Sequence, residues 1–300
     1  GSKTGGQVSF DSFISIGEMV RKLDVLNSEE FLQVEMNSYN NAQKYDPVGW
    51  ANGKYENPMN YRNDRTLFDA NGNPLYDTDW QEEATRTAIT QNHNLSFTGG
   101  DEKTSYGLYL NHSDQEGVLL ESYLKRYSGR LVLDGQVKDW LKVGGSFTFN
   151  HIEENRVDGG VGGLTALRMM VETLPIVPVK YPSGDYGTNA DYPNMEGGEN
   201  PVNILLNRTN ILKTQTFLGD VYANIDIAKN LQLRTSIGAN INNNFNNSIK
   251  IKADGENKNV SPAYDTTTGY FAGVSFTKEA KDMNFDLDLM YGNEDGLINQ

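Results

Sequence analysis

Residues 216–241 read TFLGDVYANIDIAKNLQLRTSIGANI, and this stretch decides the fold. From Phe217 to Ile227 every second residue is apolar or small, and most of the residues between them are polar. The same alternation resumes at Leu231, after three intervening residues. Successive side chains of a β-strand point to opposite faces, so the pattern predicts two strands, each with one apolar and one polar face. The short join between them predicts an antiparallel hairpin.

The same period of two recurs in further stretches of the chain. They are residues 8–16, 91–98, 106–111, 127–133, 141–150, 271–276 and 283–291. The clearest begins at Leu141, where Val143, Phe147 and Phe149 alternate with polar or small residues. Together with the hairpin, these stretches predict about nine strands.

The connections between these strands alternate in length. Short joins are predicted near residues 99–104, 134–139, 229–230 and 278–282, and long excursions at 18–90, 112–124, 152–214 and 242–269. A membrane barrel has short periplasmic turns at one end and long external loops at the other, which requires this order. We therefore predict an all-β fold, an antiparallel up-and-down meander that forms part of a transmembrane β-barrel, with short helices in its long loops.

The strand faces carry the chemistry that a barrel wall needs. In hydrocarbon every backbone donor and acceptor must be paired within the protein, so closed barrels and helices are the structures that span. The polar face of residues 216–241, with Asp220, Asn224 and Arg234, suits a water-filled lumen. Aromatic residues near strand ends are expected at the membrane interfaces: Trp140, Tyr127, Phe271 and Tyr291. The alternative is a soluble secreted β-sheet module that binds glycans, in which each half-polar strand has one solvated face.

Two short helices are predicted within the long loops. Asn27 and Glu30 have the spacing of a capping box, and the apolar residues that follow predict a helix up to about Tyr39. Apolar residues between positions 164 and 174 recur at steps of three and four before a proline ends the pattern. Residues 181–201 are rich in proline and glycine and have no periodicity, so we expect an external loop there.

The composition excludes several functional classes. The 300-residue chain has 26 basic and 40 acidic residues and a net charge of −14, which offers no electrostatic footprint for nucleic acid. It has no cysteine, so neither a disulfide nor a thiolate metal site is available. No stretch approaches 18 consecutive apolar residues, which argues against a transmembrane helix but leaves a barrel of transmembrane strands open.

No enzymatic motif is found in the sequence. The three histidines, His93, His112 and His151, lie far apart along the chain and lack metal-site spacing, so strand-end polar positions explain them better. No Gly-x-Ser-x-Gly nucleophile motif occurs, and the glycine-rich run 159–163 is not followed by the Lys-Ser/Thr of a phosphate loop. The segment 69–73 lacks the full ligand spacing of a calcium loop, which favours an Asx turn. We therefore predict a protein that is not an enzyme, with no catalytic residue, metal or cofactor.

Aromatic residues of the long loops are the candidate ligand contacts. Flat rings can stack on the apolar face of a sugar, while neighbouring Asn and Asp side chains bind its hydroxyl groups. The candidates are Trp50, Tyr55, Tyr61, Tyr181, Tyr186 and Tyr192. The alternative role for these rings is packing within the loops themselves.

Short motifs occur in a fixed order between residues 8 and 149. They are VSF from residue 8, KLDVLNSEEF at 22–31, TDWQEE at 78–83, QNHNLSFTGG at 91–100, DQEG at 114–117, KRY at 125–127 and DWLKV at 139–143. Each motif is short, but the ordered set is specific. In this order the chain resembles the SusC-like (RagA-like) TonB-linked outer-membrane receptors.

The resemblance implies a wide barrel around a plug domain in the bacterial outer membrane, surrounded by outer-membrane lipid. It implies import of oligosaccharides or other large nutrients, energised by the TonB system through the plug, with a SusD-like surface lipoprotein as a lid. Residues 1–291 would be the N-terminal part of that barrel without the plug, since nine strands are too few to close it. Residues 292–300 resemble an Asn- and Gly-containing loop from further downstream in the family, so we expect a displaced segment there.

Overall fold

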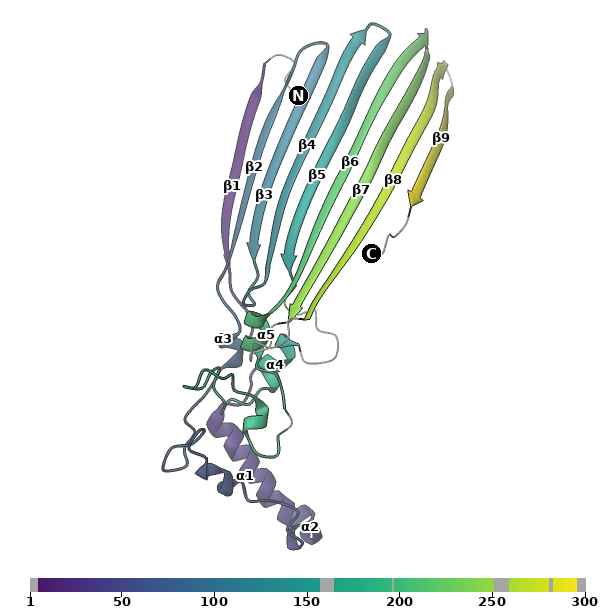
Figure 1. Cartoon of the computed structure of the whole chain (residues 1–300). Coiled ribbons are helices and arrows are strands. Elements are labelled where there is room, and N and C mark those ends of the chain that lie inside the picture. The colour runs from purple at the N-terminus through teal and green to yellow at the C-terminus, as the bar shows by residue number, and fades with distance from the viewer. Residues whose placement is uncertain (1–4, 157–164, 196, 251–258, 281–282, 296–300) are drawn as a thin grey trace.

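A computed structural model describes residues 5–156, 165–195, 197–250, 259–280 and 283–295, and from residue 247 onward it describes the backbone course alone. In these residues nine strands form one antiparallel sheet, and each strand pairs with its neighbours in sequence (Figure 1). The strands are β1 (Gln7–Gly17), β2 (Ala88–Gly100), β3 (Thr104–Glu116), β4 (Tyr123–Lys138), β5 (Leu141–Asn155), β6 (Arg208–Ala228), β7 (Leu231–Lys250), β8 (Asn259–Ala280) and β9 (Met283–Asp295). The predicted antiparallel meander is confirmed.

Several strands are longer than the alternation predicts. β6 begins at Arg208 rather than near residue 216, and β7 continues to Lys250 rather than ending near residue 241. The added part of β7 is rich in asparagine on both faces and therefore carries no alternation. Its backbone still pairs residue by residue with β6, as far as Arg208 opposite Lys250. Backbone hydrogen bonds, which form whatever the side chains, thus extend this hairpin beyond its amphipathic part.

The connections have the predicted parity at the two ends of the sheet (Figure 1). Residues 101–103, 139–140 and 229–230 form tight turns at one end. Residues 18–87, 117–122 and 156–207 form longer connections at the other end. The connections 251–258 and 281–282 lie outside the described residues, as do residues 296–300 of the expected displaced segment.

The long connections contain short helices, as predicted, but more of them. They are α1 (Ser28–Tyr45), α2 (Pro47–Ala51), η1 (Pro58–Asn63), α3 (Trp80–Glu83), α4 (Ala166–Glu172), η2 (Asn189–Asp191) and α5 (Pro201–Asn207). The capping box forms at the start of α1, where Asn27 and Glu30 each accept a hydrogen bond from the other's backbone N–H. α1 continues past Tyr39 because no helix breaker precedes Pro47. The signal for α5 is local: the side chain of Asn200 caps the helix, with Pro201 at its first position.

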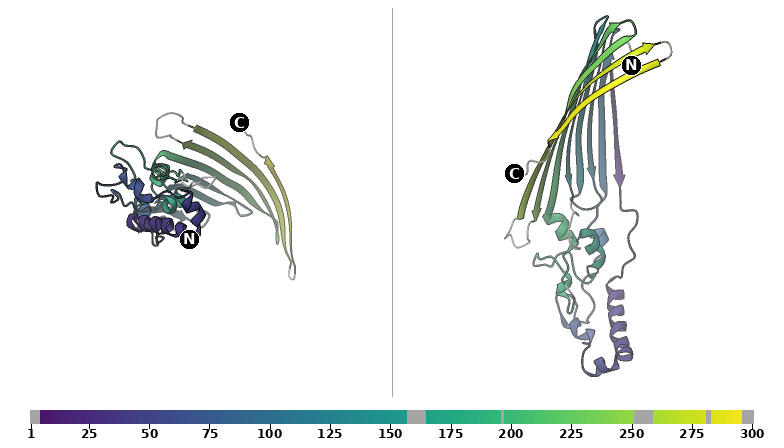
Figure 2. Two further views of the ribbon diagram at one scale, coloured as in Figure 1. Left: turned by 90° about the horizontal axis from the view of Figure 1, so that it is seen from below. Right: turned by 90° about the vertical axis from the view of Figure 1, so that its right-hand side faces the viewer.

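The two faces of the sheet differ in chemistry. On one face Tyr106, Leu133, Val221 and Ile237 lie in a single cross-strand row, because each strand pairs them in register through Gly145. In four such rows, from the level of Val143 to that of Phe149 on β5, no described side chain of this apolar face is charged. The opposite face carries Asp134, Ser146, Asp220, Asn224, Arg234 and Asn240. Alternation of apolar and polar residues along each strand thus gives the curved sheet of Figure 2 one apolar and one polar surface.

The height of the apolar surface matches a bilayer. Leu141, one row beyond the turn end of the four uncharged rows, and Phe149, at their loop end, lie about 26 Å apart along β5 at about 3.3 Å per residue. A strand tilt of about 40° reduces this to about 20 Å, close to the roughly 25 Å apolar band of membrane barrels.

A row of rings marks the loop-side boundary of the apolar surface. His93, His112, Tyr127 and His151 are paired in register across β2 to β5. Their successive ring centroids lie 5.9, 4.7 and 6.2 Å apart. The next row toward the loops contains the charged residues Asp114, Lys125, Glu153 and Lys213. Tyr127 therefore lies at the boundary between the uncharged and the charged rows, and Trp140 lies in the turn between β4 and β5. Their placement at the membrane interfaces stays a prediction, and the side chains of Phe271 and Tyr291 lie outside the described residues.

Among the described residues no second layer covers the apolar face (Figure 2). Val8, Phe10 and Ile237 on this face are each more than 60% exposed. A soluble β-sheet module would bury these side chains, so their exposure favours the membrane-barrel interpretation. No helix in the described part of the chain combines the length and the apolar content needed to cross a bilayer.

Candidate ligand-binding mouth

The two longest connections, residues 18–87 and 165–207, fold together at one end of the sheet and are called the loop unit here (Figure 1). The first contributes Leu32, Leu67, Phe68, Trp80 and Ala84 to a shared buried core. The second contributes Ala166, Met169, Met170, Leu174, Ile176, Val177, Tyr192, Val202, Ile204 and Leu205. Burial of this apolar surface is what holds the two connections together.

Hydrogen bonds across the core fix the register of the two connections. The indole Nε1 of Trp80 donates to the carbonyl oxygen of Leu174 at 3.0 Å. Two residues earlier, the hydroxyl of Thr78 donates to the carbonyl of Val177 at 2.8 Å. These bonds join residues more than ninety positions apart and satisfy polar groups that the core would otherwise leave unpaired.

The loop unit is attached to the rim of the sheet through the connection 117–122. Arg86 donates from its backbone to Val118 at 2.8 Å and from its guanidinium to the carbonyls of Gly117 and Ser122. The backbone N–H of Leu120 donates to Ala84 at 3.2 Å, and its side chain packs against the shared core. The loop unit is therefore held over the end of strands β2 to β4.

A half-buried carboxylate joins α1 to the second connection. The hydroxyl of Tyr192 lies 2.8 Å from both carboxylate oxygens of Glu35. Burial raises the pKa of the Glu35 carboxyl above its ordinary value of 4.5, although the Tyr192 hydroxyl and the Arg62 charge oppose this shift. Burial and the carboxylate also raise the pKa of Tyr192, so the phenol keeps its proton and remains the donor.

The raised pKa gives the loop unit a pH dependence. Because folding raises the pKa of Glu35, the folded state binds the proton more tightly, so stability falls as pH rises from 4.5 through the folded pKa and then levels off. We expect Glu35→Gln, which keeps an oxygen acceptor for Tyr192, to slow hydrogen exchange of α1 in the complete receptor at pH 7. The difference should disappear below pH 4.5. Slower exchange of the wild type at pH 7 would contradict this assignment.

The candidate aromatic residues of the first connection lie in different environments. Trp50 packs on Tyr39, with ring centroids 4.4 Å apart, and is partly exposed. The hydroxyl of Tyr55 donates to Asp46 at 2.8 Å. The Gly49 backbone N–H, this hydroxyl and Lys54 together lower the pKa of Asp46 to about 2. Tyr61 is partly exposed and packs edge-on against Tyr192.

The candidates of the second connection are held by neighbours. Tyr181 donates to Asp191 at 3.1 Å and packs edge-on against Tyr76. Tyr186 lies under the Lys180 ammonium, 4.5 Å from the ring centroid, and its hydroxyl accepts from Asn207. Tyr192 is 1% exposed, so its ring can pack in the core but cannot stack on a ligand in this conformation. Loop packing thus occupies these rings, and ligand contact by the other five stays a prediction.

The loop unit shows no sign of metal chemistry among its described residues. Asp69 accepts hydrogen bonds from the backbone N–H groups of Asn71 and Asn73, both at 2.8 Å, which confirms the predicted Asx turn. No group of three or more His, Asp and Glu side chains in the described residues is arranged to hold a metal ion.

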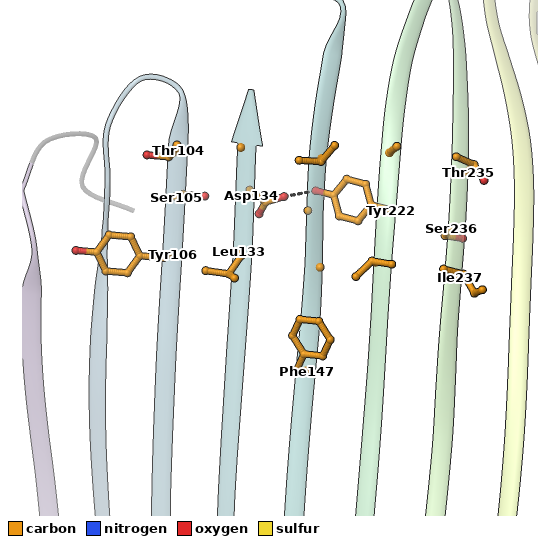
Figure 3. Close-up of a pocket in the computed structure, with 16 residues that line it drawn as sticks. Thr104, Ser105, Tyr106, Leu133, Asp134, Phe147, Tyr222, Thr235, Ser236 and Ile237 are labelled. Carbon is orange, nitrogen blue, oxygen red and sulfur yellow. Dashed lines mark hydrogen bonds between the residues drawn. The ribbon is translucent and has the colours of Figure 1, made fainter. Parts of the chain in front are cut away.

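The apolar face of the sheet has a groove of about 690 Å³ near the turn end (Figure 3). Tyr106 and Leu133 form one side of it, and Ile237 lies on the other. Gly145 forms its floor, where an added Cβ would lie 2.7 Å from the carbonyl oxygen of Asp220. The carboxylate of Asp134 points to the opposite face and accepts from the Tyr222 hydroxyl. This groove is a gap in the apolar wall, not a polar ligand site.

The chain is similar to outer-membrane receptors along much of its length. TonB-dependent receptor P3 of Formosa agariphila is 25% identical over 166 residues, which are 54% of this chain and 16% of that receptor. The TonB-dependent receptor SusC of Bacteroides thetaiotaomicron is 23% identical over 251 residues, which are 77% of this chain and 22% of SusC. No family model matches the chain.

A structure of the RagAB peptide transporter shares the fold. It aligns with a TM-score of 0.67 at 19% identity over 98% of this chain and 35% of that one. A second structure, the RagAB peptide importer in the closed-closed state, aligns with a TM-score of 0.64 at 19% identity over 97% of this chain and 34% of that one. Together with the two-faced sheet, these similarities define the class that the chain resembles: it is similar to a wall segment of the outer-membrane β-barrel of TonB-dependent receptors. Within that class the similarity is to SusC-like receptors, and the chain spans 16–22% of the length of the two curated receptors described above.

Proposed function

We propose that this chain forms part of the wall and the external mouth of a receptor that imports oligosaccharides across the outer membrane. The observation that carries the proposal is one sheet with a band of four uncharged rows on its outer face, a polar inner face and a folded loop unit at one end. Energy would come from the TonB system through a plug domain. A SusD-like surface lipoprotein would close the mouth over the substrate.

Movement of substrate, without covalent chemistry, is the activity that this geometry supports. The loop unit offers partly exposed rings beside amide and carboxylate groups, such as Trp50 and Tyr55 with Asp46. Rings of this kind stack on sugars, while the polar groups bind hydroxyls. The competing substrate is a peptide, because the RagAB structures are described as those of a peptide importer.

Gene deletion tests the transport proposal. A strain that lacks the complete receptor should fail to grow on oligosaccharides too large for porins and should grow normally on their monosaccharides. Depletion of TonB should reproduce the defect. If the deletion strain grows normally on oligosaccharides but fails to grow on peptides, the proposed substrate is a peptide and not a saccharide. A receptor recovered in the soluble fraction without detergent would overturn the membrane assignment.

Trp50→Ala tests the mouth. We expect a several-fold weaker affinity for the oligosaccharide, because a stacked aromatic ring contributes about 0.5–1.5 kcal/mol beyond its buried area. Calorimetric titration of the purified receptor with its lid lipoprotein measures the change. Tyr45→Ala is the matched control, since Tyr45 is another aromatic residue of the same connection that is 75% exposed at the last position of α1. Equal affinities for the wild type and Trp50→Ala would remove Trp50 from the site.

A further inference from the structure

The inner, polar face of the sheet contains a site made from strands β1 to β5. The residues that line a cavity of about 420 Å³ there include Asp11, Asn94, Asn111, Asn150, Tyr109 and Arg130. A second cavity, of about 830 Å³, extends toward the turn end and is also lined by Tyr109 and Arg130. These two residues are directly paired across β3 and β4, so they stand side by side where the cavities meet.

Tyr109 has its ring laid along the wall. An added Cβ on Gly107, two residues away on the same face, would lie 2.9 Å from ring atom Cε2 and 3.0 Å from the hydroxyl oxygen of Tyr109. The ring therefore leans over the glycine, and a larger residue at position 107 would make the ring shift. The Tyr109 side chain is 45% exposed, so its ring is accessible from the lumen. An aromatic ring held in this way is a platform on which a flat ligand can stack.

Arg130 brings a positive charge beside this platform. Its side chain is exposed, and no described residue forms a hydrogen bond or an ion pair with it. The nearby acids of the inner face have other partners. Asp134 binds Tyr222 and Lys142, and Asp220 accepts from Ser146. Asp11, which lines the smaller cavity from β1, accepts from the amide of Asn94 at 3.5 Å. A guanidinium in this setting is suited to a planar, two-point hydrogen bond with a carboxylate.

Amide groups complete the site one row nearer the loops. Asn94, Asn111 and Asn150 share a cross-strand row with Ser128. The amide of Asn111 donates to Asn94 at 2.6 Å and to Asn92 at 3.1 Å, which fixes the orientation of these groups before any ligand arrives. Such a row offers both donors and acceptors, as a chain of sugar hydroxyls requires.

We propose that this inner-wall site binds a carboxylate-bearing sugar, a uronic acid residue of an oligosaccharide on its way through the barrel. The sugar ring stacks on Tyr109, its carboxylate pairs with Arg130, and its hydroxyl groups bind the amide row. The inference rests on the proposed transport function and adds to it the acidic class of substrate. A neutral sugar would leave Arg130 unpaired.

Binding of trigalacturonate, compared with neutral maltotriose, tests the site. The complete receptor is purified in detergent and titrated by calorimetry with each sugar. We expect Arg130→Gln to weaken trigalacturonate binding at least tenfold, because hydrogen bonds to a charged group are the strong ones. Arg130→Lys should recover part of the loss, and Tyr109→Ala should weaken binding several-fold. Arg126→Gln is the matched control, since Arg126 is an exposed arginine on the same face of β4 that lines neither cavity.

The outcomes separate this site from a contact with the plug domain and from the transport proposal itself. Equal weakening of both sugars by Arg130→Gln, or equal effects of Arg130→Gln and Arg126→Gln, would show a plug contact only and overturn the inference. Absence of trigalacturonate binding in the wild type would also overturn it. Growth on neutral oligosaccharides that still depends on the receptor would leave the transport proposal intact in each case.

Discussion

Leu131→Arg is expected to prevent the complete receptor from accumulating in the outer membrane. Leu131 lies in the middle of the uncharged rows of the outer face, paired in register with Leu108 on β3 and Phe147 on β5. An arginine at the midplane of the lipid-facing surface costs about 2–4 kcal/mol. Such a loss is a large part of the stability of a folded domain, so assembly should fail or slow severely. Quantitative blotting of the outer-membrane fraction measures the effect.

Val132→Arg is the matched control for this substitution. Val132 is the next residue of β4 and points to the inner face, in the same row as Ser146 and Asp220. An arginine there meets water and an acidic neighbour, so wild-type amounts of receptor should reach the membrane. Equal losses for both variants would mean that the two faces of the sheet do not meet lipid and water, and the barrel assignment would fail.

Trp80→Ala is expected to separate the two connections of the loop unit. Trp80 is 3% exposed, and its indole donates to Leu174 across the shared core. Truncation of a buried tryptophan costs about 3–5 kcal/mol, and the Leu174 carbonyl also loses its partner. The barrel strands should be unaffected, because their pairing does not depend on this core. Limited proteolysis of the receptor should therefore cut within residues 18–87 and 165–207 while the strands stay protected.

Trp50→Ala serves as the control for Trp80→Ala. Both changes remove an indole from the first connection, but Trp50 is partly exposed and packs on Tyr39 outside the shared core. We expect wild-type resistance to protease for this variant. Rapid cleavage of Trp50→Ala, or resistance of Trp80→Ala, would show that the core described for the loop unit is not what holds the connections together.

The strand order could be predicted from the sequence because the signals for a meander are local. Each strand has an apolar period of two, and each tight turn, such as that at Lys229 and Asn230, lies between two such stretches. The extensions at Arg208 and Lys250 escaped prediction because their partners, not their side-chain pattern, keep them extended. Prediction fails where the information lies in the neighbouring strand.

The mouth was less predictable for a related physical reason. Aromatic residues in loops look alike in sequence, whether they bind a ligand or fill a core. Tyr192 and Trp50 are distinguished only by what packs around them, residues that lie more than a hundred positions away for Tyr192. The ring row illustrates the same limit, because His93, His112 and His151 become neighbours only through the register of four strands. The helix caps at Asn27 and Asn200, by contrast, can be recognised from the few residues that follow each of them.

The shared core of the loop unit constrains how such receptors can be re-engineered or diversified. An external segment that folded by itself could be exchanged between receptors as an independent unit. Here Leu32 and Trp80 on one segment are complementary to Met169 and Leu205 on the other. Grafting either segment alone into a foreign barrel would expose its half of the apolar core to water. New specificities must therefore be transplanted, or must evolve, with both segments together.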